Sequence, residues 1–378
     1  MQTRNTANFY TNRIDRLCDI SLNLNLDFCI ISSAPALTYY SGYFFYFEHG
    51  QSPFQVLPAL LIISPKQGHT LLLADNEQPP EVTASILRVD TYQSYSFREP
   101  LSFPDQFDAS VKSIIGKGSI SKIRVGIESR SLPVFAADVI ESSFPNVQWV
   151  DIFRDLAMER IVKDQLEISM IKSAAELCDL GQRTLKNNVK SGHTELELFS
   201  LVGRSINEAA GTRVPVMADF VSGPRTAQGG GIPSGKKILD NELLLADLTP
   251  CLNGYWGDCC GTIAAGNIIS QQRNDFAKVK DGLFRAIDAI KPGVRSFQID
   301  ELLRKHVYDY PHHSGHGVGT MNHEEPRITP YNNMELQAGM VIALEPAIYR
   351  DDYGIRLEHL LLVTKDGAEQ LTAFDYQL

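Results

Sequence analysis

The sequence lacks any apolar run long enough to cross a membrane, and its first residues, MQTRNTANFYTNRID, lack the apolar core of a signal peptide. Positive charge is scarce: 35 Lys and Arg against 45 Asp and Glu give a net charge of −10. This balance argues against nucleic acid or an anionic membrane as a partner. The six cysteines show neither zinc-binding spacing nor a disulfide framework. We therefore expect a cytoplasmic protein that binds neither nucleic acid nor a membrane.

The chain is long enough for two domains, each with its own core, because it has 378 residues. Residues 1–155 contain short apolar strands and a helical pattern, which predicts an α/β domain. The charged segment MERIVKD, residues 158–164, marks the domain boundary. Beyond it, long amphipathic helices alternate with paired strands. We predict an α/β (α+β) fold with domains 1–155 and 156–378.

The second domain is predicted to consist of two successive halves that have the same order of helices and strands. Each half has a helix, a second helix and then paired strands that carry two acids, 11 residues apart in the first half and 13 in the second. Thr194 and Glu197 predict a capping box at the start of one of these helices. Residues 340–344 and 355–363 are the paired strands of the second half. This pseudo-repeat suggests two halves that meet at a shared site.

The segment ELLLADLTPCLNGYWGDCCGTIA, residues 242–264, predicts a β-hairpin. Asn253-Gly254 is a strong signal for a two-residue turn, and it would place Asp247 opposite Cys260. Asp247 and Asp258 then lie on one face as diagonal neighbours, roughly 7–8 Å apart. A cation between them would relieve their repulsion, although two acids near a turn are also commonly just solvated.

Two adjacent cysteines follow Asp258 and have two interpretations. Cys259 and Cys260 could be soft metal ligands, or they could be small residues that pack within a strand. Packing is favoured, because adjacent side chains on a strand point to opposite faces.

Between the two halves, His316 is flanked by Gly315 and Gly317, which allow the backbone to approach a neighbour closely. Four acids and this imidazole could form one cluster, and two divalent cations would balance the four negative charges. Oxygen-rich ligation suits Mn²⁺ best and leaves Zn²⁺, Co²⁺ and Fe²⁺ open. The cluster consists of Asp247, Asp258, His316, Glu345 and Glu358.

The same residues resemble the five-ligand dinuclear site of the pita-bread metallohydrolases, which include methionine aminopeptidase, aminopeptidase P, prolidase and creatinase. The likeness rests on Asp247 and Asp258, Gly315-His316-Gly317, Glu345-Pro346 with Tyr349, and Arg356-Leu357-Glu358. The N-terminal part is similar to the creatinase-type domain of the prolidase and aminopeptidase P branch. The resemblance implies a creatinase-like α/β domain, then a pita-bread domain with a pseudo-twofold repeat, and a homodimer.

The resemblance also implies roles for individual residues. Asp247 would bind one metal, Asp258 and Glu358 would bridge two metals, and His316 and Glu345 would bind the second, with Glu345 also acting as proton shuttle. His323 would donate to the substrate carbonyl, His312 would contact the substrate, and Arg356 would brace the bridging acids. For these last three, a solvated surface histidine or an ordinary surface salt bridge remains the alternative. His193, His306, His313 and His359 receive no role.

One departure concerns the substrate side of the site. Peptidases of this family carry a histidine in a His-Gly-x-Pro-Ser run, and Gly230 stands at that position here. Cys260 and Gly261 replace the usual Thr or Ser and the usual arginine. The resemblance implies that the missing histidine donates a hydrogen bond at the scissile amide, and losing a donor of this kind typically costs ~10²–10³ in rate.

Three functions follow from these residues. The first is a dinuclear-metal hydrolase that cleaves a C–N amide or peptide bond, similar to an Xaa-Pro dipeptidase or aminopeptidase, on a short-peptide substrate. The second is a repurposed relative that acts on a small non-peptide molecule, as a creatinase-like hydrolase, a lyase or a metal-dependent redox enzyme. The third is a non-catalytic binding protein, against which the five retained ligands count.

Overall fold

The computed structural model describes residues 2–44, 57–65, 68–116, 122–144, 146–376 and 378. The chain forms two compact units, residues 1–160 and 161–378. Each unit is described by itself.

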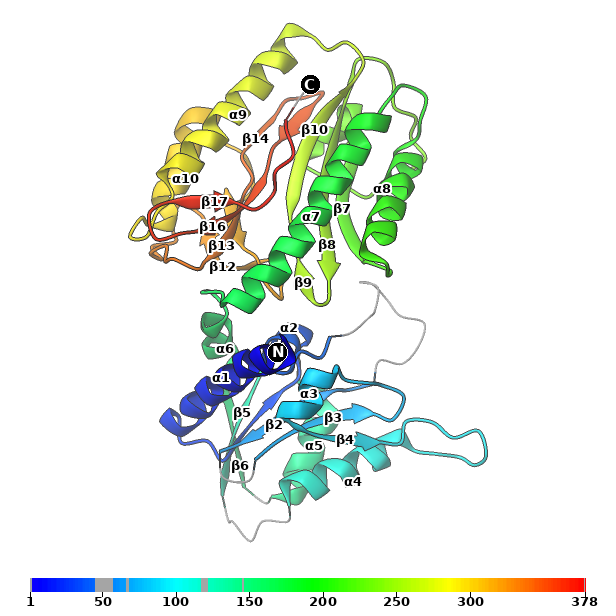
Figure 1. Cartoon of the computed structure of the whole chain (residues 1–378), viewed down its shortest axis with the longest axis vertical. Coiled ribbons are helices and arrows are strands. Elements are labelled where there is room, and N and C mark those ends of the chain that lie inside the picture. The colour runs from blue at the N-terminus through cyan, green and yellow to red at the C-terminus, as the bar shows by residue number, and fades with distance from the viewer. Residues whose placement is uncertain (1, 45–56, 66–67, 117–121, 145, 377) are drawn as a thin grey trace. The chain divides into compact units, whose positions relative to one another are not determined.

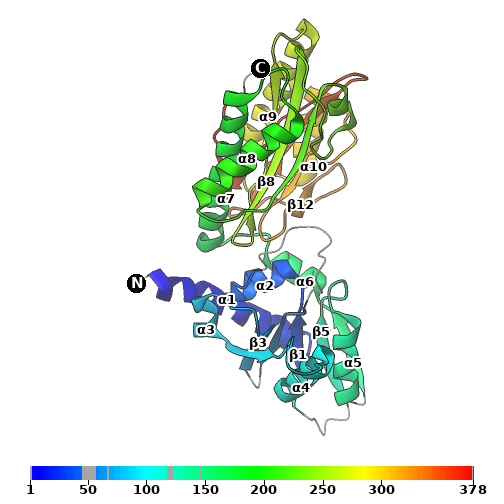
Figure 2. The same cartoon turned by 90° about the vertical axis from the view of Figure 1, so that its right-hand side faces the viewer.

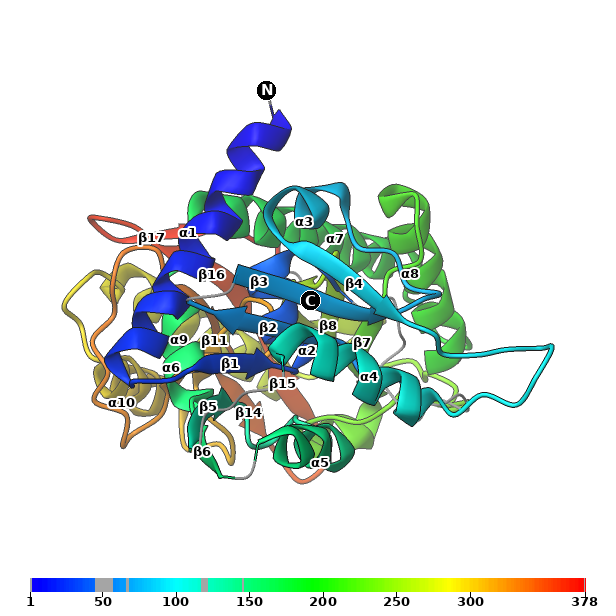
Figure 3. The same cartoon turned by 90° about the horizontal axis from the view of Figure 1, so that it is seen from below.

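The N-terminal unit contains a six-stranded sheet in the order β4-β3-β2-β1-β5-β6, which can be followed across Figure 3. β2 pairs antiparallel with β1 and with β3, and the other pairs are parallel. The strands are β1 (Phe28–Ile31), β2 (Leu60–Ser64), β3 (Gly68–Ala74), β4 (Arg88–Tyr92), β5 (Ile123–Ile127) and β6 (Val147–Asp151).

Helices cover both faces of this sheet, and its central strands β1 and β2 are buried along their whole length. In β1, Cys29 and Ile31 pack in one core with Leu17 and Leu37, whereas Phe28 and Ile30 pack in a second core. An all-buried strand of this kind is typical of an α/β sheet. The helices are α1 (Gln2–Asn23), α2 (Ala34–Ser41), α3 (Glu81–Ile86), α4 (Phe103–Ile115), α5 (Val134–Ser143) and α6 (Phe153–Glu159).

The C-terminal unit begins with two helices followed by a sheet in the order β10-β8-β7, with β9 paired to β8. The predicted capping box of α8 is confirmed, since Thr194 Oγ1 accepts from the Glu197 N–H and Glu197 accepts from the Thr194 N–H. The elements are α7 (Gln165–Asn188), α8 (Glu195–Ala210), β7 (Val216–Ser222), a 3₁₀ helix η1 (Gly223–Gln228), β8 (Glu242–Leu252), β9 (Tyr255–Trp256) and β10 (Cys259–Ala265).

The second half repeats the helix pair and then forms a five-stranded sheet in the order β12-β11-β13-β16-β17, with β14 and β15 paired separately. The helix pairs α7–α8 (green) and α9–α10 (yellow) flank the strands in Figure 1 and in the turned view of Figure 2. The elements are α9 (Ser270–Ala289), α10 (Ser296–Val307), β11 (Gly315–Gly317), β12 (Glu324–Ile328), β13 (Val341–Leu344), β14 (Ala347–Tyr349), β15 (Gly354–Arg356), β16 (His359–Val363) and β17 (Ala368–Gln370).

The single strand predicted over residues 355–363 is wrong, because the chain leaves the strand between Arg356 and His359. Glu358 instead forms an isolated bridge with Cys260, and its N–H donates to the Cys260 carbonyl at 2.9 Å. This bridge joins the second half to β10 of the first half. The interruption therefore carries Glu358 next to the hairpin that contains Asp258.

Candidate metal centre

The predicted hairpin between β8 and β9 forms with the expected register. Asn253 and Gly254 have φ values of 51° and 81°, and Asp247 lies opposite Cys260. The returning strand is interrupted at residues 257–258, where α7 comes close: a Cβ on Gly257 would lie 2.7 Å from the Ala174 carbonyl oxygen. Asp258 therefore projects from a break between β9 and β10.

Three residues from separate strands and loops meet at this break. Ligand atoms of Asp258, His316 and Glu358 all lie within 4.8 Å of one another, and all three residues are buried. His316 Nε2 is 3.5 Å from Asp258 Oδ2 and 3.5 Å from Glu345 Oε1. The acids of one half thus face the imidazole and acid of the other half.

Local structure orients the His316 ring toward these acids. Its Nδ1 lies 3.1 Å from the Gly317 carbonyl oxygen, which can only accept, so Nδ1 donates and the Nε2 lone pair faces the cluster. A Cβ on Gly315 or Gly317 would collide with the Ala343 or Glu325 carbonyl. The two glycines let strands β13 and β12 close tightly around the histidine.

The buried acids are poorly compensated by protein groups. Burial raises the pKa of Asp258 and of Glu358 well above the ordinary range, and repulsion from the other acids adds to it. Among the residues that the structure describes, Glu358 Oε2 has no hydrogen-bond partner. Buried carboxylate oxygens without donors are satisfied by cations, so this donor set fits divalent metal ions.

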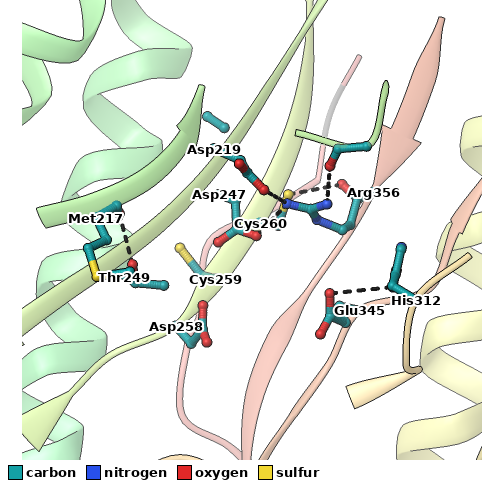
Figure 4. Close-up of polar contacts among 12 residues, drawn as sticks. Met217, Asp219, Asp247, Thr249, Asp258, Cys259, Cys260, His312, Glu345 and Arg356 are labelled. Carbon is teal, nitrogen blue, oxygen red and sulfur yellow. Dashed lines mark hydrogen bonds and ion pairs between the residues drawn. The ribbon is translucent and has the colours of Figure 1, made fainter. Parts of the chain in front are cut away.

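Asp247 and Arg356 form a second part of the site. Burial raises the pKa of Asp247 to about 6 against the opposing attraction of Arg356. Arg356 Nη2 donates to Asp247 Oδ2 at 2.6 Å and to Asp219 Oδ2 at 2.8 Å, and Figure 4 shows the guanidinium beside both acids. Arg356 thus contacts Asp247 and Asp219 rather than the predicted bridging acids, because Asp219 faces Asp247 in the β7–β8 register.

Glu345 differs from the other acids. Burial opposes its ionisation, but the hydrogen bond from His313 and the positive charge of Arg356 lower its pKa. His313 Nε2 lies 2.8 Å from Glu345 Oε1. His313 is not among the site residues predicted from the sequence, where its position beside His312 is the available signal.

The other two histidines predicted from the sequence, His312 and His323, line a cavity of about 790 Å³. His313, Tyr310 and Arg327 also line it. The rings of His323 and His316 have centroids 3.9 Å apart. His312 Nε2 lies 2.9 Å from the Tyr349 hydroxyl, and its Nδ1 is 3.7 Å from Glu345 Oε2. The cavity therefore opens beside the acids.

Asp219 was also missed from the sequence. It is the only charged residue of β7 (VMADFVS), and a single acid inside an apolar strand was the available signal. The two cysteines of β10 pack as expected: burial raises the pKa of both thiols well above the ordinary range, which keeps them protonated.

Comparison with known proteins bears directly on this arrangement. Residues 13–162 match the creatinase/prolidase N-terminal domain, and residues 169–365 match the model of metallopeptidase family M24. The chain belongs to metallopeptidase family M24.

Similar proteins agree with this family. An Xaa-Pro dipeptidase of Pyrococcus furiosus is 33% identical over 236 residues, which cover 60% of this chain and 67% of that protein. An uncharacterized peptidase of Staphylococcus aureus is 28% identical over 370 residues, covering 96% and 99%. The crystal structure of the Pyrococcus horikoshii prolidase has a TM-score of 0.82 at 25% identity and covers 97% of this chain and 99% of its own.

Family membership confirms several predictions. The fold is a pita-bread domain preceded by a creatinase-like α/β domain, and the chain is a metal-dependent hydrolase of the M24 family. Divalent metal ions are implied, and the donor set around His316 fits them. Among the described helices, none is long and apolar enough to span a membrane.

Proposed function

We propose that this M24 member is a dinuclear-metal peptidase that hydrolyses Xaa-Pro dipeptides. The observation that supports it is the buried group of Asp258, His316 and Glu358, which lies beside a cavity lined by histidines. The similarity to an Xaa-Pro dipeptidase supports the substrate class. A small non-peptide substrate is less favoured, because the relatives described above are named as peptidases or prolidases.

Five side chains would hold the two ions, and we propose Mn²⁺ because four of the five donors are carboxylates. Once bound, such ions polarise a carbonyl and lower the pKa of a water molecule. The proposed ligands are Asp247, Asp258, His316, Glu345 and Glu358.

The surrounding residues would supply the proton chemistry and the orientation of the substrate. His323, whose ring lies against His316, would donate to the scissile carbonyl. Glu345 would take the proton released by water and transfer it to the leaving nitrogen. His312, fixed by the Tyr349 hydroxyl, would contact the substrate at the cavity, and Arg356 would hold Asp247 in position.

We also propose a homodimer, on the basis of the family resemblance. The cytoplasmic location and the domains 1–155 and 156–378 are proposed from the composition and the charged boundary segment of the sequence. Light scattering coupled to size-exclusion chromatography distinguishes a dimer from a monomer, and a monomeric mass would contradict this assembly.

Metal analysis combined with a dipeptide panel tests the proposal. We expect about two ions per chain after manganese loading, and release of proline from Xaa-Pro dipeptides but not from dipeptides without proline. Glu358→Gln should lose both metal and activity, whereas Asp288→Asn, an exposed acid of α9, should keep both. A wild-type protein that binds two ions and cleaves no dipeptide would contradict the peptidase assignment.

A further inference from the structure

Asp219 is a carboxylate of the site that is fixed on two sides and open on a third. Its Oδ1 accepts from the Gly231 N–H at 2.8 Å, and its Oδ2 accepts from Arg356 Nη2 at 2.8 Å. Its side chain is nevertheless 40% exposed, against 6% for Arg356 and 16% for Asp247. Asp219 is therefore the member of this charged group that can still meet a ligand from solvent. Figure 4 shows it beside Arg356 and Asp247.

Asp219 also explains why residue 230 is glycine. Gly229 and Gly231 have φ values of 83° and 150°, which favour glycine, but Gly230 lies outside this left-handed region. Its backbone could therefore carry a side chain. The obstacle is steric, because a Cβ at residue 230 would lie well inside 3.0 Å of the Asp219 carboxylate. A side chain at residue 230 would therefore require the Asp219 carboxylate to shift away from its contacts with the Gly231 N–H and Arg356.

The exchange changes the charge on the substrate side. Related peptidases, by the resemblance described above, present an imidazole from residue 230, which donates a hydrogen bond to substrate. This chain presents a carboxylate, which accepts hydrogen bonds and attracts cations. Replacing an imidazole with a carboxylate makes this wall less favourable for an anionic substrate group and more favourable for a cationic one.

Asp219 is connected to the cavity through a chain of contacts. Arg356 Nη1 lies 3.2 Å from the Tyr349 hydroxyl, which lies 2.9 Å from His312 Nε2. His312 lines the cavity of about 790 Å³. Asp219 does not line this cavity itself; Arg356 and Tyr349 connect it to His312, which does.

We propose that Asp219, for which Gly230 leaves room, is a specificity residue that binds the ammonium group of a positively charged substrate. This inference rests on the proposed peptidase function and assigns a charge to its substrate. The ammonium can come from the free amino terminus or from a lysine side chain.

Kinetics of wild type and Asp219→Asn with four substrates test the charge preference. The substrates are Lys-Pro, Met-Pro, Glu-Pro and N-acetyl-Met-Pro. We expect wild type to favour the substrate with the recognised ammonium, and the asparagine variant to lose about tenfold in kcat/KM on it, mainly through KM, as for one charge-assisted hydrogen bond. If wild type prefers Lys-Pro over Met-Pro, the recognised ammonium is that of the lysine side chain. If it prefers Met-Pro over N-acetyl-Met-Pro, the recognised ammonium is that of the free amino terminus.

The asparagine keeps an acceptor for the Gly231 N–H, so its fold should persist, and Asp288→Asn serves as the matched control. An equal loss on all four substrates, or no loss on any, would overturn the proposal. Calorimetric binding of lysine amide and norleucine amide to the manganese-loaded protein adds a readout that needs no cleavage. A further outcome is a wild type that cleaves no dipeptide and yet binds lysine amide more tightly than norleucine amide, with the difference lost in Asp219→Asn. In that case the peptidase assignment fails while the ammonium subsite stands.

Thermal unfolding tests the steric conflict between the Asp219 carboxylate and a side chain at residue 230. We expect Gly230→His to lower the unfolding midpoint, and the double variant Asp219→Ala, Gly230→His to recover most of the loss, since the acid no longer occupies the space. A Gly230→His protein as stable as wild type would show that the acid does not determine the glycine.

Discussion

Lys163 Nζ lies 2.9 Å from Glu324 Oε2, and both side chains are almost fully buried, at 0% and 3% exposure. Glu324 follows His323 directly and also accepts from the Met321 N–H at 3.2 Å. The ion pair therefore joins Lys163, two residues before α7, to the first residue of β12, which directly follows a proposed catalytic histidine.

Lys163→Met should destabilise the protein strongly, because it removes one charged partner of a buried ion pair with Glu324. Removing one partner of such a pair costs ~3–5 kcal/mol. Urea unfolding monitored by circular dichroism measures the change. Glu208→Gln, in the exposed pair Arg204–Glu208, is the control and should change the midpoint little. An equal effect of the two substitutions would contradict the importance of burial.

Metal removal should destabilise the protein more at neutral pH than at acidic pH. Burial raises the folded-state pKa of Asp247 to about 6 and that of Asp258 and Glu358 further. The unfolded acids titrate near ~4, so their contribution to the stability of the metal-free protein is present below that pH and is lost as the pH rises through about 6 and above.

The measurement is the unfolding midpoint of manganese-loaded and EDTA-treated protein at several pH values from 5 to 8. The gap between the two forms should widen as the pH rises, because ionised ligands also bind metal more tightly. A gap that is constant or narrows would mean that these acids do not form the metal site.

Arg356→Lys should weaken metal binding, although it conserves the charge. A lysine ammonium is a point charge and cannot contact Asp247, Asp219 and the Gly229 carbonyl together as the guanidinium does. Residues that orient ligands typically contribute 10–100-fold in metal affinity. Competition with a fluorescent chelator gives the affinity, and Arg285→Lys on the exposed face of α9 is the control. Unchanged affinity would remove Arg356 from the metal site.

Gly254→Ala should destabilise the hairpin, because residue 254 has a φ of 81°. An L-residue with a side chain in this region pays ~1–2 kcal/mol. Asn253→Gly should be nearly neutral, since glycine tolerates the φ of 51° at that position. Thermal unfolding and metal content of both variants provide the comparison. A stable Gly254→Ala protein with full metal content would show that the ribbon does not depend on this turn.

The features of the site that could be predicted from the sequence are those set by residues close together in the chain. The register that puts Asp247 opposite Cys260 follows from Asn253-Gly254, a few residues away, and the capping box of α8 follows from residues three apart. These features are local, so neighbouring residues suffice to specify them. The proposed metal ligands were found because their spacing resembles that of a known family.

Other features depended on contacts between distant segments. The interruption at Glu358 results from its pairing with Cys260, and His313 acquired a partner only when Glu345 was brought to it. Neither contact leaves a periodic pattern in the residues that make it.

The sequence by itself therefore determined the two α/β units, the hairpin, and the family with its metal-dependent chemistry, because turn geometry, capping and ordered ligands are properties of nearby residues or of a known motif. Only the tertiary structure decided what replaces the missing histidine. Asp219 and Gly230 are neighbours because the chain turns back after β7, and packing rather than local preference makes the acid and the glycine depend on each other.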